Sequence, residues 1–251
     1  QRYLIYKKGI TPMNRPNTVC FYNGPSMLDG VDIVALASGL TKDSDNPKTS
    51  AMLQVDILLK DIKPQEAIKT GKDVSICGDC SLRGNECYVN AWQSQNSKWQ
   101  SFQRGNVPYY SPARVGEICN FNNLPVRLGS YGDPSALRVD TIKELLTAAN
   151  TGHTGYTHQW THPNFDARIF DYCMASVDNV HTVERLHKLY PGVRYYRMTN
   201  DITTLASNEI ICPSDPNKLN IDGSRTVTCN TCKLCNGKST QAKNIVVKEI
   251  K

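Results

Sequence analysis

Ten cysteines, seven of them in two groups, constrain this chain more than any other feature. The C-terminal group is the run Cys229-Asn-Thr-Cys232-Lys-Leu-Cys235, with Cys212 upstream as a fourth thiol. Thiolates are soft anionic ligands, and C-x2-C-x2-C spacing can bring three sulfurs to one tight turn. The pattern predicts a metal site, either an iron–sulfur cluster or zinc, and a pair of disulfides is the alternative.

The upstream group is Cys77-Gly-Asp-Cys80, followed by Cys87. Three thiolates on a four-iron cluster leave one iron open to a substrate or cofactor, whereas zinc would need a fourth ligand from another cysteine or a histidine. Tyr88 directly follows Cys87, so we expect an aromatic ring beside an open site. The alternative for this group is a structural zinc knuckle or a loop clamp.

The composition is that of a globular protein. With 251 residues, of which 39% are hydrophobic and 21% charged, the chain can bury a full core as one α/β domain, with or without an appendage. No apolar run approaches the roughly 20 residues that span a bilayer, and the N-terminus has no signal-peptide core. Clustered cysteines without such a signal favour the reducing cytoplasm, so we expect a cytoplasmic protein with no membrane partner.

Several motifs of well-known enzyme classes are absent from the sequence. It contains no Walker loop, GxGxxG, HExxH or GxSxG, which disfavours ATPases, dinucleotide-dependent enzymes, zinc proteases and α/β-hydrolases. It also lacks the H-x-E motif of zinc deaminases. The net charge of +6 is spread without a basic block and is typical of a solvated surface.

Three segments are expected along the chain. Residues 1–30 are rich in Pro, Asn and Gly and predict an irregular lead-in, residues 31–211 predict an α/β domain that contains the 77–87 cysteines, and residues 212–251 predict a Cys-rich segment that folds around its metal. Short apolar runs predict strands at 31–37, 52–59, 126–131, 154–159, 173–177, 193–198 and 209–212. Helical periodicity or composition predicts helices at 88–104, 135–150, 164–172 and 180–190. This alternation indicates βαβ units and a partial (β/α) barrel.

Polar residues and glycines cluster where the strand at 126–131 ends. In the run Leu128-Gly-Ser-Tyr-Gly-Asp-Pro134, Gly129 and Gly132 could let a cofactor approach the backbone, and Asp133 could accept hydrogen bonds from an ammonium group. The carboxyl ends of parallel strands face the active site in such folds. An ordinary strand-to-helix turn is the alternative.

Polar residues also follow the next expected strands. His158 and Asp178, together with Tyr131, are candidates for contact with a substrate, and Ser176 is a candidate for binding a cofactor. A hydrogen-bonded structural role is the alternative for the histidine. Arg197 could bind a carboxylate or phosphate, with a surface salt bridge as the default.

The order of motifs resembles a known group of proteins. CGDC…CYVN, RLGSYGDP, GYTHQW, ASVDN and the terminal CxxCxxC are similar, over residues 45–237, to the phage- and plasmid-borne “gene product 88” group, whose members are uncharacterised. The resemblance implies a phage or mobile-element protein that acts in the host cytoplasm.

The layout also resembles radical S-adenosylmethionine enzymes, which have a partial barrel with three cysteines in a loop after the first strand. This resemblance implies that Cys77, Cys80 and Cys87 hold a [4Fe–4S] cluster and that Tyr88 lies near the adenine of S-adenosylmethionine. It further implies that Gly132-Asp133-Pro134 matches the motif for the methionine amino group. The other four clustered cysteines would hold an auxiliary cluster. The family spacing is C-x3-C-x2-C, whereas this chain has C-x2-C-x6-C.

Our leading hypothesis is a radical-S-adenosylmethionine-like enzyme with one or two [4Fe–4S] clusters. It would take electrons from a reductase and abstract hydrogen from an unknown small-molecule or nucleic-acid substrate near Tyr131, His158 and Asp178. The alternative is a non-catalytic phage protein that zinc stabilises at both cysteine groups and that binds nucleic acid or a virion component. The metal in protein purified without oxygen distinguishes the two.

Overall fold

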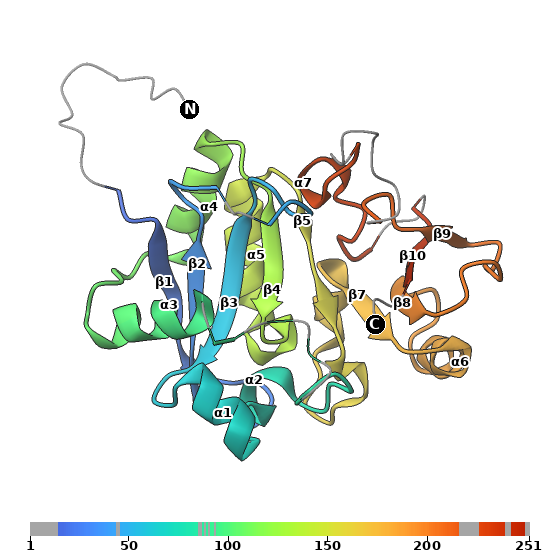
Figure 1. Ribbon diagram of the computed structural model, residues 1–251, viewed down its shortest axis with the longest axis horizontal. Helices are drawn as coiled ribbons and strands as arrows, with labels where there is room; N and C mark the ends of the chain where they lie inside the picture. The colour runs from blue at the N-terminus through green and yellow to red at the C-terminus, as the bar shows by residue number, and fades with distance from the viewer. Residues whose placement is uncertain are drawn as a thin grey trace.

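The chain forms two five-stranded β-sheets flanked by helices (Figure 1), seen in a computed structural model that describes residues 15–43, 46–84, 87, 89, 91–92, 94–215, 226–238 and 242–248. The first sheet contains, in spatial order, β1 (Thr18–Pro25), β2 (Asp32–Ser38), β3 (Leu53–Leu59), β4 (Val126–Tyr131) and β5 (His153–Thr154). The second contains β6 (Tyr156–Thr157), β7 (Met174–Val177), β8 (Tyr195–Thr199), β10 (Asn244–Lys248) and β9 (Glu209–Ile211).

Helices connect many of these strands, and α3, α4 and α5 pack on the first sheet. They are α1 (Pro64–Thr70), α2 (Val74–Cys77), α3 (Ser94–Gln103), α4 (Pro112–Phe121), α5 (Val139–Ala149), α6 (Val180–Leu189) and α7 (Cys229–Cys232), with short 3-10 helices η1 (Pro134–Ala136), η2 (Gln159–Thr161) and η3 (Ala167–Asp171). Figure 1 shows α5 behind β3 and β4, and α3 in front of β1 and β2. None of the described helices is long and apolar enough to cross a membrane.

Strand direction changes within the first sheet. β1, β2 and β3 pair antiparallel, β3, β4 and β5 pair parallel, and every pair in the second sheet is parallel. Only Gly155 separates β5 from β6, so one segment passes from the first sheet to the second. The predicted α/β class is therefore confirmed. The described strands form no closed barrel, and the likeness to a radical-S-adenosylmethionine barrel stays a prediction.

Two strands lie where the sequence analysis expected none. β1 occupies much of the predicted irregular lead-in, because the apolar run Val19-Cys20-Phe21 is fully buried despite its flanking polar residues. β10 lies in the predicted metal-binding tail and pairs between β8 and β9, with Ile245 and Val246 fully buried. The C-terminal segment thus contributes to the sheet as well as to the cysteine group.

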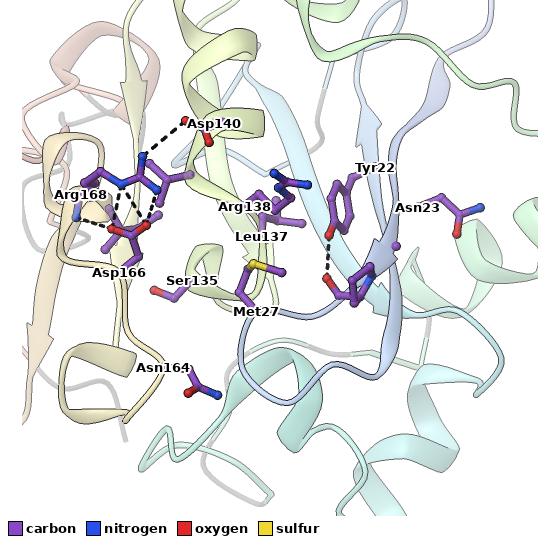
Figure 2. Close-up of a pocket in the computed structure, with 14 residues that line it drawn as sticks. Tyr22, Asn23, Met27, Ser135, Leu137, Arg138, Asp140, Asn164, Asp166 and Arg168 are labelled. Atoms are coloured by element: carbon purple, nitrogen blue, oxygen red, sulfur yellow. Dashed lines mark hydrogen bonds and ion pairs between the residues drawn. The ribbon is translucent and has the colours of Figure 1, made fainter.

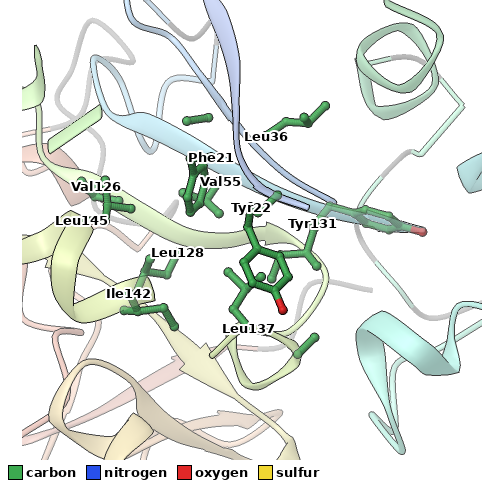
Figure 3. Packing of buried hydrophobic residues seen from close by; sticks show 14 of the residues in the cluster. Phe21, Tyr22, Leu36, Val55, Val126, Leu128, Tyr131, Leu137, Ile142 and Leu145 are labelled. Carbon is green, nitrogen blue, oxygen red and sulfur yellow. The ribbon is translucent and has the colours of Figure 1, made fainter. Parts of the chain in front are cut away.

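The main core lies between the first sheet and α4 and α5 (Figure 3). Ile142 and Leu145 of α5 lie against Val126 and Leu128 of β4, and all four are at most 1% exposed. Burial of each such side chain contributes about 1.5–3 kcal/mol. A Cβ at Gly116 of α4 would lie 2.4 Å from the Leu145 carbonyl oxygen, so the two helices cross in close contact.

Candidate functional site

The upstream cysteine loop lies at the carboxyl ends of the parallel strands. Cys77 is the last residue of α2, and its carbonyl accepts a hydrogen bond from Gln159 Nε2 at 2.7 Å. The Asp79 N–H donates to Gln159 Oε1 at 3.2 Å, and the Asp133 N–H donates to the Ile76 carbonyl at 2.7 Å. These bonds fix the loop beside the residues that follow β4 and β6, as expected for a parallel α/β fold.

Gly78, between the first two cysteines, is required by the geometry of this loop. Its backbone has φ 53° and ψ −132°, a conformation that side chains other than glycine avoid. A Cβ there would lie 1.8 Å from Gln159 Oε1. The close approach of Gln159 is therefore possible only with glycine in the C-G-D-C sequence.

Arg83 holds the same loop from its other side. Its guanidinium donates to the Gly78 carbonyl at 2.7 Å and to the Gly71 carbonyl at 2.9 Å, and it pairs with Asp73 at 2.9 Å. An arginine can make these contacts together because its planar group carries five N–H donors. The sequence analysis missed Arg83, for which a basic residue between Cys80 and Cys87 was the only available signal.

The three upstream thiols are electrostatic neighbours. Burial raises the pKa of Cys77 well above its usual value, and the charges of Asp73, Cys80, Asp133 and Cys87 raise it further. Burial likewise raises the pKa of Cys80 to about 11. Cys87 is exposed. The hydrogen bond to Asp73 raises the pKa of Arg83, and the charges of Cys77 and Cys80 raise it further, so this guanidinium is a cation close to both thiols.

Asp133 is buried and its oxygens are used within the protein. Oδ2 accepts the His158 N–H at 2.8 Å, with the His158 ring nitrogen Nδ1 4.0 Å away, and Oδ1 accepts the Ser135 N–H at 2.9 Å. Burial raises the pKa of Asp133, although these hydrogen bonds and the His158 charge oppose the rise. These contacts are typical of an ordinary strand-to-helix turn, which was the alternative interpretation of residues 128–134. A role for Asp133 in binding an ammonium group stays a prediction.

Two buried polar atoms near this loop have no hydrogen-bond partner in the described part of the chain: Tyr131 Oη and His158 Nε2. Tyr131 is 3% exposed, and its ring points away from the core residues Leu128 and Ile142 (Figure 3). Burial raises its pKa, and the Cys77 charge is the next cause. Buried polar atoms are nearly always hydrogen-bonded, so each of these two atoms retains the capacity to bond a further group.

A buried ion pair lies near Tyr131 and was not foreseen. Asp56 of β3 is fully buried, pairs with Lys98 of α3 and accepts a hydrogen bond from Gln95 at 3.3 Å. The Asp56 charge also raises the pKa of Tyr131. A single acidic residue inside the apolar run 52–59 was the only signal in the sequence.

The two candidate glycines fill packing roles. Gly129 and Gly132 have φ of 62° and 78°, and a Cβ at either would lie 2.8 Å from protein atoms, namely the Gly132 carbonyl oxygen and Ile57 Cβ respectively. The space beside each glycine is therefore occupied by the chain itself. Their role in cofactor binding stays a prediction.

The remaining upstream candidates lie around the same loop. Asp178 is exposed, accepts a hydrogen bond from Ser81 Oγ at 3.1 Å and raises the pKa of Cys80 through its charge. Ser176 is buried, and its carbonyl accepts the indole N–H of Trp160 at 3.0 Å. Tyr88 lies outside the described residues.

The C-terminal group lies at the opposite end of the strands. The Cys229 N–H, at the start of α7, donates to the Lys48 carbonyl at 2.8 Å, and Asn230 Nδ2 donates to the Ala51 carbonyl at 2.6 Å. Lys233 Nζ donates to the Thr151 carbonyl at 3.2 Å. Ala51 and Thr151 precede β3 and β5, so α7 sits at the amino ends of these strands, far from α2 in Figure 1.

The four C-terminal thiols are also neighbours. Burial raises the pKa of Cys235 to about 12, and the charges of Cys212, Cys229 and Cys232 raise it further, whereas the Tyr156 hydroxyl lowers it. All ten cysteines are free, so the disulfide alternative is not what the structure contains.

Arg194 fixes the segment that carries Cys235. Its guanidinium donates to the carbonyls of Leu234 at 2.8 Å, Gly237 at 2.9 Å and Lys243 at 2.8 Å. This contact was not expected from the sequence, because Arg194 stands at the start of a strand some 40 residues before its partners.

Arg197 differs from both of its expected roles. It is buried and forms an ion pair with Glu209 at 2.8 Å, in place of a surface salt bridge or a ligand contact. The partner comes from β9, and no local pattern in the sequence indicates it.

No three His, Cys, Asp or Glu side chains are arranged to hold a metal ion within the described ranges. The thiols of each group are thus close enough to interact electrostatically but do not form a coordination shell, and the seven metal-ligand assignments stay predictions. No protein-family model, curated protein or solved structure matches the chain.

Proposed function

We propose that the protein is an iron–sulfur enzyme whose upstream cluster is held by Cys77, Cys80 and Cys87. The observation that carries this proposal is the position of these free thiols beside two unpartnered buried atoms, Tyr131 Oη and His158 Nε2. A ligand bound between the thiols and these atoms would use polar groups that the protein leaves unused.

The donor set fits an iron–sulfur cluster better than an all-thiol zinc site. Soft thiolates suit both metals, but three local cysteines leave one coordination position open on a four-iron cluster. Burial and then the charges of Asp73 and the neighbouring thiols raise the pKa of Cys77, and a bound cation would offset both effects. The sulfurs form no metal-binding group as described, so the proposal requires the loop side chains to rearrange when a cluster binds.

The chain's own residues prepare the site for a substrate. Asp133 holds the His158 backbone, so the His158 ring is kept close to the loop with Nε2 available as donor or acceptor. Tyr131 Oη is held in a buried position where its raised pKa keeps it protonated as a donor. Asp178 adds an exposed carboxylate on the Cys80 side. Together these groups can bind and orient a polar substrate.

The reaction class that this arrangement supports is one-electron chemistry like that of radical S-adenosylmethionine enzymes. When bound, a reduced cluster with an open iron supplies an electron to a ligand such as S-adenosylmethionine. A cytoplasmic reductase would supply the electrons, and the substrate would be a small molecule or a nucleotide. We also propose that the chain belongs to the gene product 88 group. The order of the sequence motifs is the only support for that membership.

A second cluster is proposed at Cys212, Cys229, Cys232 and Cys235. Four thiols can close a coordination shell, and closed sites hold structure or relay electrons. Burial raises the pKa of Cys229, and the charges of Lys48 and Arg127 oppose the rise. Since α7 and α2 lie at opposite ends of the strands, this centre would not touch the substrate of the first.

Metal analysis of protein purified without oxygen tests the proposal. We expect iron and acid-labile sulfide with visible absorption, loss of one cluster's iron in Cys80→Ala, and full iron in the matched control Cys20→Ala, whose thiol lies in the core. Reductant-dependent cleavage of S-adenosylmethionine should be lost in Cys80→Ala alone. Colourless protein with stoichiometric zinc would overturn the proposal and favour the zinc-stabilised binding protein.

A further inference from the structure

A pocket of about 500 Å³ lies away from the cysteines, between the β1–β2 connection, the start of α5 and residues 164–169 (Figure 2). This volume is within the range of small-molecule sites. Met27, Leu137 and Ile169 give it an apolar part. Nothing described for the cysteine loop or for α7 involves this pocket, apart from Ser135, whose N–H bonds Asp133.

One side of the pocket is positively charged. Arg138 is exposed and forms no ion pair with any carboxylate of the described residues. Figure 2 shows its guanidinium beside Tyr22, and its charge acts on the Tyr22 phenol. Tyr22 Oη donates to the Pro25 carbonyl at 2.6 Å, so its own oxygen remains free to accept. A carboxylate entering here would find an unpaired guanidinium.

The opposite side carries net negative charge. Arg168 pairs with Asp166 at 2.6 Å and lies 3.6 Å from Asp140, so two carboxylates share one guanidinium (Figure 2). Because the pair with Asp166 uses two guanidinium nitrogens, Asp140 is the less satisfied of the two acids. An ammonium group entering on this side would be attracted to Asp140.

We propose that this pocket binds a small zwitterion, such as a free amino acid with an apolar side chain. Its carboxylate would pair with Arg138, its ammonium group would lie against Asp140, and its side chain would contact Met27 and Leu137. A simple anion would be repelled by the acidic side and a simple cation by Arg138. Separated charges of both signs are therefore needed to match both walls.

Three probes with the same aromatic body separate these contributions: L-phenylalanine, 3-phenylpropionate, which lacks the amino group, and 2-phenylethylamine, which lacks the carboxylate. Binding to the 251-residue chain is measured by calorimetry and by ligand-induced shifts in Tm. We expect L-phenylalanine to bind about tenfold or more tightly than either analogue, the scale of one lost charged hydrogen bond.

Variants assign each charge. Arg138→Gln should reduce L-phenylalanine affinity to about that of 2-phenylethylamine, and Asp140→Asn should reduce it to about that of 3-phenylpropionate. Arg114→Gln is the control, because Arg114 is also an exposed arginine but lies on α4, where it pairs with Glu117. Its affinity should equal that of the unmodified protein.

Three outcomes would overturn the proposal. They are no saturable binding of L-phenylalanine below ~10 mM, equal binding of 3-phenylpropionate, and unchanged affinity in Arg138→Gln. Thermal unfolding of each variant without probe confirms that it is folded, and Asp140→Asn provides an independent test where Arg138→Gln is unstable.

Discussion

Gln159 Nε2 donates to the Cys77 carbonyl at 2.7 Å, although 82 residues separate the two in sequence. The bond ties the end of the second sheet's first strand to the cysteine loop, and Gln159 Oε1 also accepts the Asp79 N–H. One fully buried amide therefore fixes the backbone on both sides of Gly78. The arrangement of the upstream thiols depends on this contact as much as on their spacing.

The first prediction concerns Gly78. Gly78→Ala should lower the free energy of unfolding by about 1–3 kcal/mol or more, because alanine is strained at this backbone conformation and meets Gln159. The double variant Gly78→Ala/Gln159→Ala should recover part of this loss, since it removes the clash but not the strain. Chemical denaturation measures both. Equal stability of Gly78→Ala and the unmodified protein would show that the loop is not packed as described.

The second prediction concerns Tyr131. In metal-free protein, Tyr131→Phe should raise the free energy of unfolding by about 1–3 kcal/mol, because it removes a buried hydroxyl without a partner. The same variant should lose turnover if the hydroxyl contacts substrate. Tyr195→Phe is the matched control, because its hydroxyl is bonded to Glu209 at 3.0 Å and its removal should destabilise. A destabilised Tyr131→Phe would mean that the hydroxyl has a partner.

The third prediction concerns Arg83. Arg83→Gln should loosen the loop between Cys80 and Cys87, because a glutamine cannot reach the Gly71 and Gly78 carbonyls together with Asp73. We expect faster amide hydrogen exchange in the loop and lower iron content at the upstream site. Arg114→Gln, which lies on α4, should change neither. Unaltered amide hydrogen exchange in Arg83→Gln would show that Arg83 does not hold the loop in place.

The fourth prediction concerns pH. Burial raises the pKa of Glu209, but hydrogen bonds from Arg197, the Ala206 N–H and Tyr195 outweigh it and leave the pKa below its usual value of 4.5. As pH falls below 4.5, the unfolded chain therefore takes up the proton first, and stability is lost as pH falls through the folded pKa. Glu209→Gln should make the free energy of unfolding less dependent on pH in this acidic range.

The same variant has a large effect at neutral pH. Because the Arg197–Glu209 side chains are 6% and 3% exposed, Glu209→Gln should cost about 3–5 kcal/mol by leaving a buried charge unpaired. Glu117→Gln, which breaks an exposed pair, should cost less than about 1 kcal/mol. Denaturation at pH 7 and at pH 4 measures both effects, and a similar cost for the two variants would contradict the burial of the first pair.

Local patterns predicted several elements well. The apolar spacing that includes Ile142 and Leu145 predicted a helix where α5 lies, because a helix that buries one face repeats its apolar residues every 3.6 positions. The run at 173–177 predicted β7, which is buried on every side. β10 was missed because its apolar run is too short to show a period and follows a cysteine-rich stretch.

The candidate site was predictable only in part. The cysteine spacing divided seven thiols into two groups, and their role as metal ligands stays a prediction, since no three of these side chains are arranged around a metal in the described residues. No pattern in the sequence predicted the contacts made by Arg83, Gln159 and Arg194. Each of these side chains donates to backbone carbonyl groups, which every residue carries. Arg197 was misjudged for a related reason, since its acidic partner lies on another strand.

Local patterns along the chain were therefore enough to predict an α/β fold, but not the antiparallel pairing of β1, β2 and β3. Only the folded chain could put Cys77 at one end of the strands and Cys229 at the other, and bring Arg138 and Asp140 to a common pocket. The physical reason is the distance in sequence between the residues that interact. A helix turn or a ligand loop is encoded by residues a few positions apart, whereas sheet order and pocket walls arise from contacts between distant segments, which leave no periodic trace in the sequence.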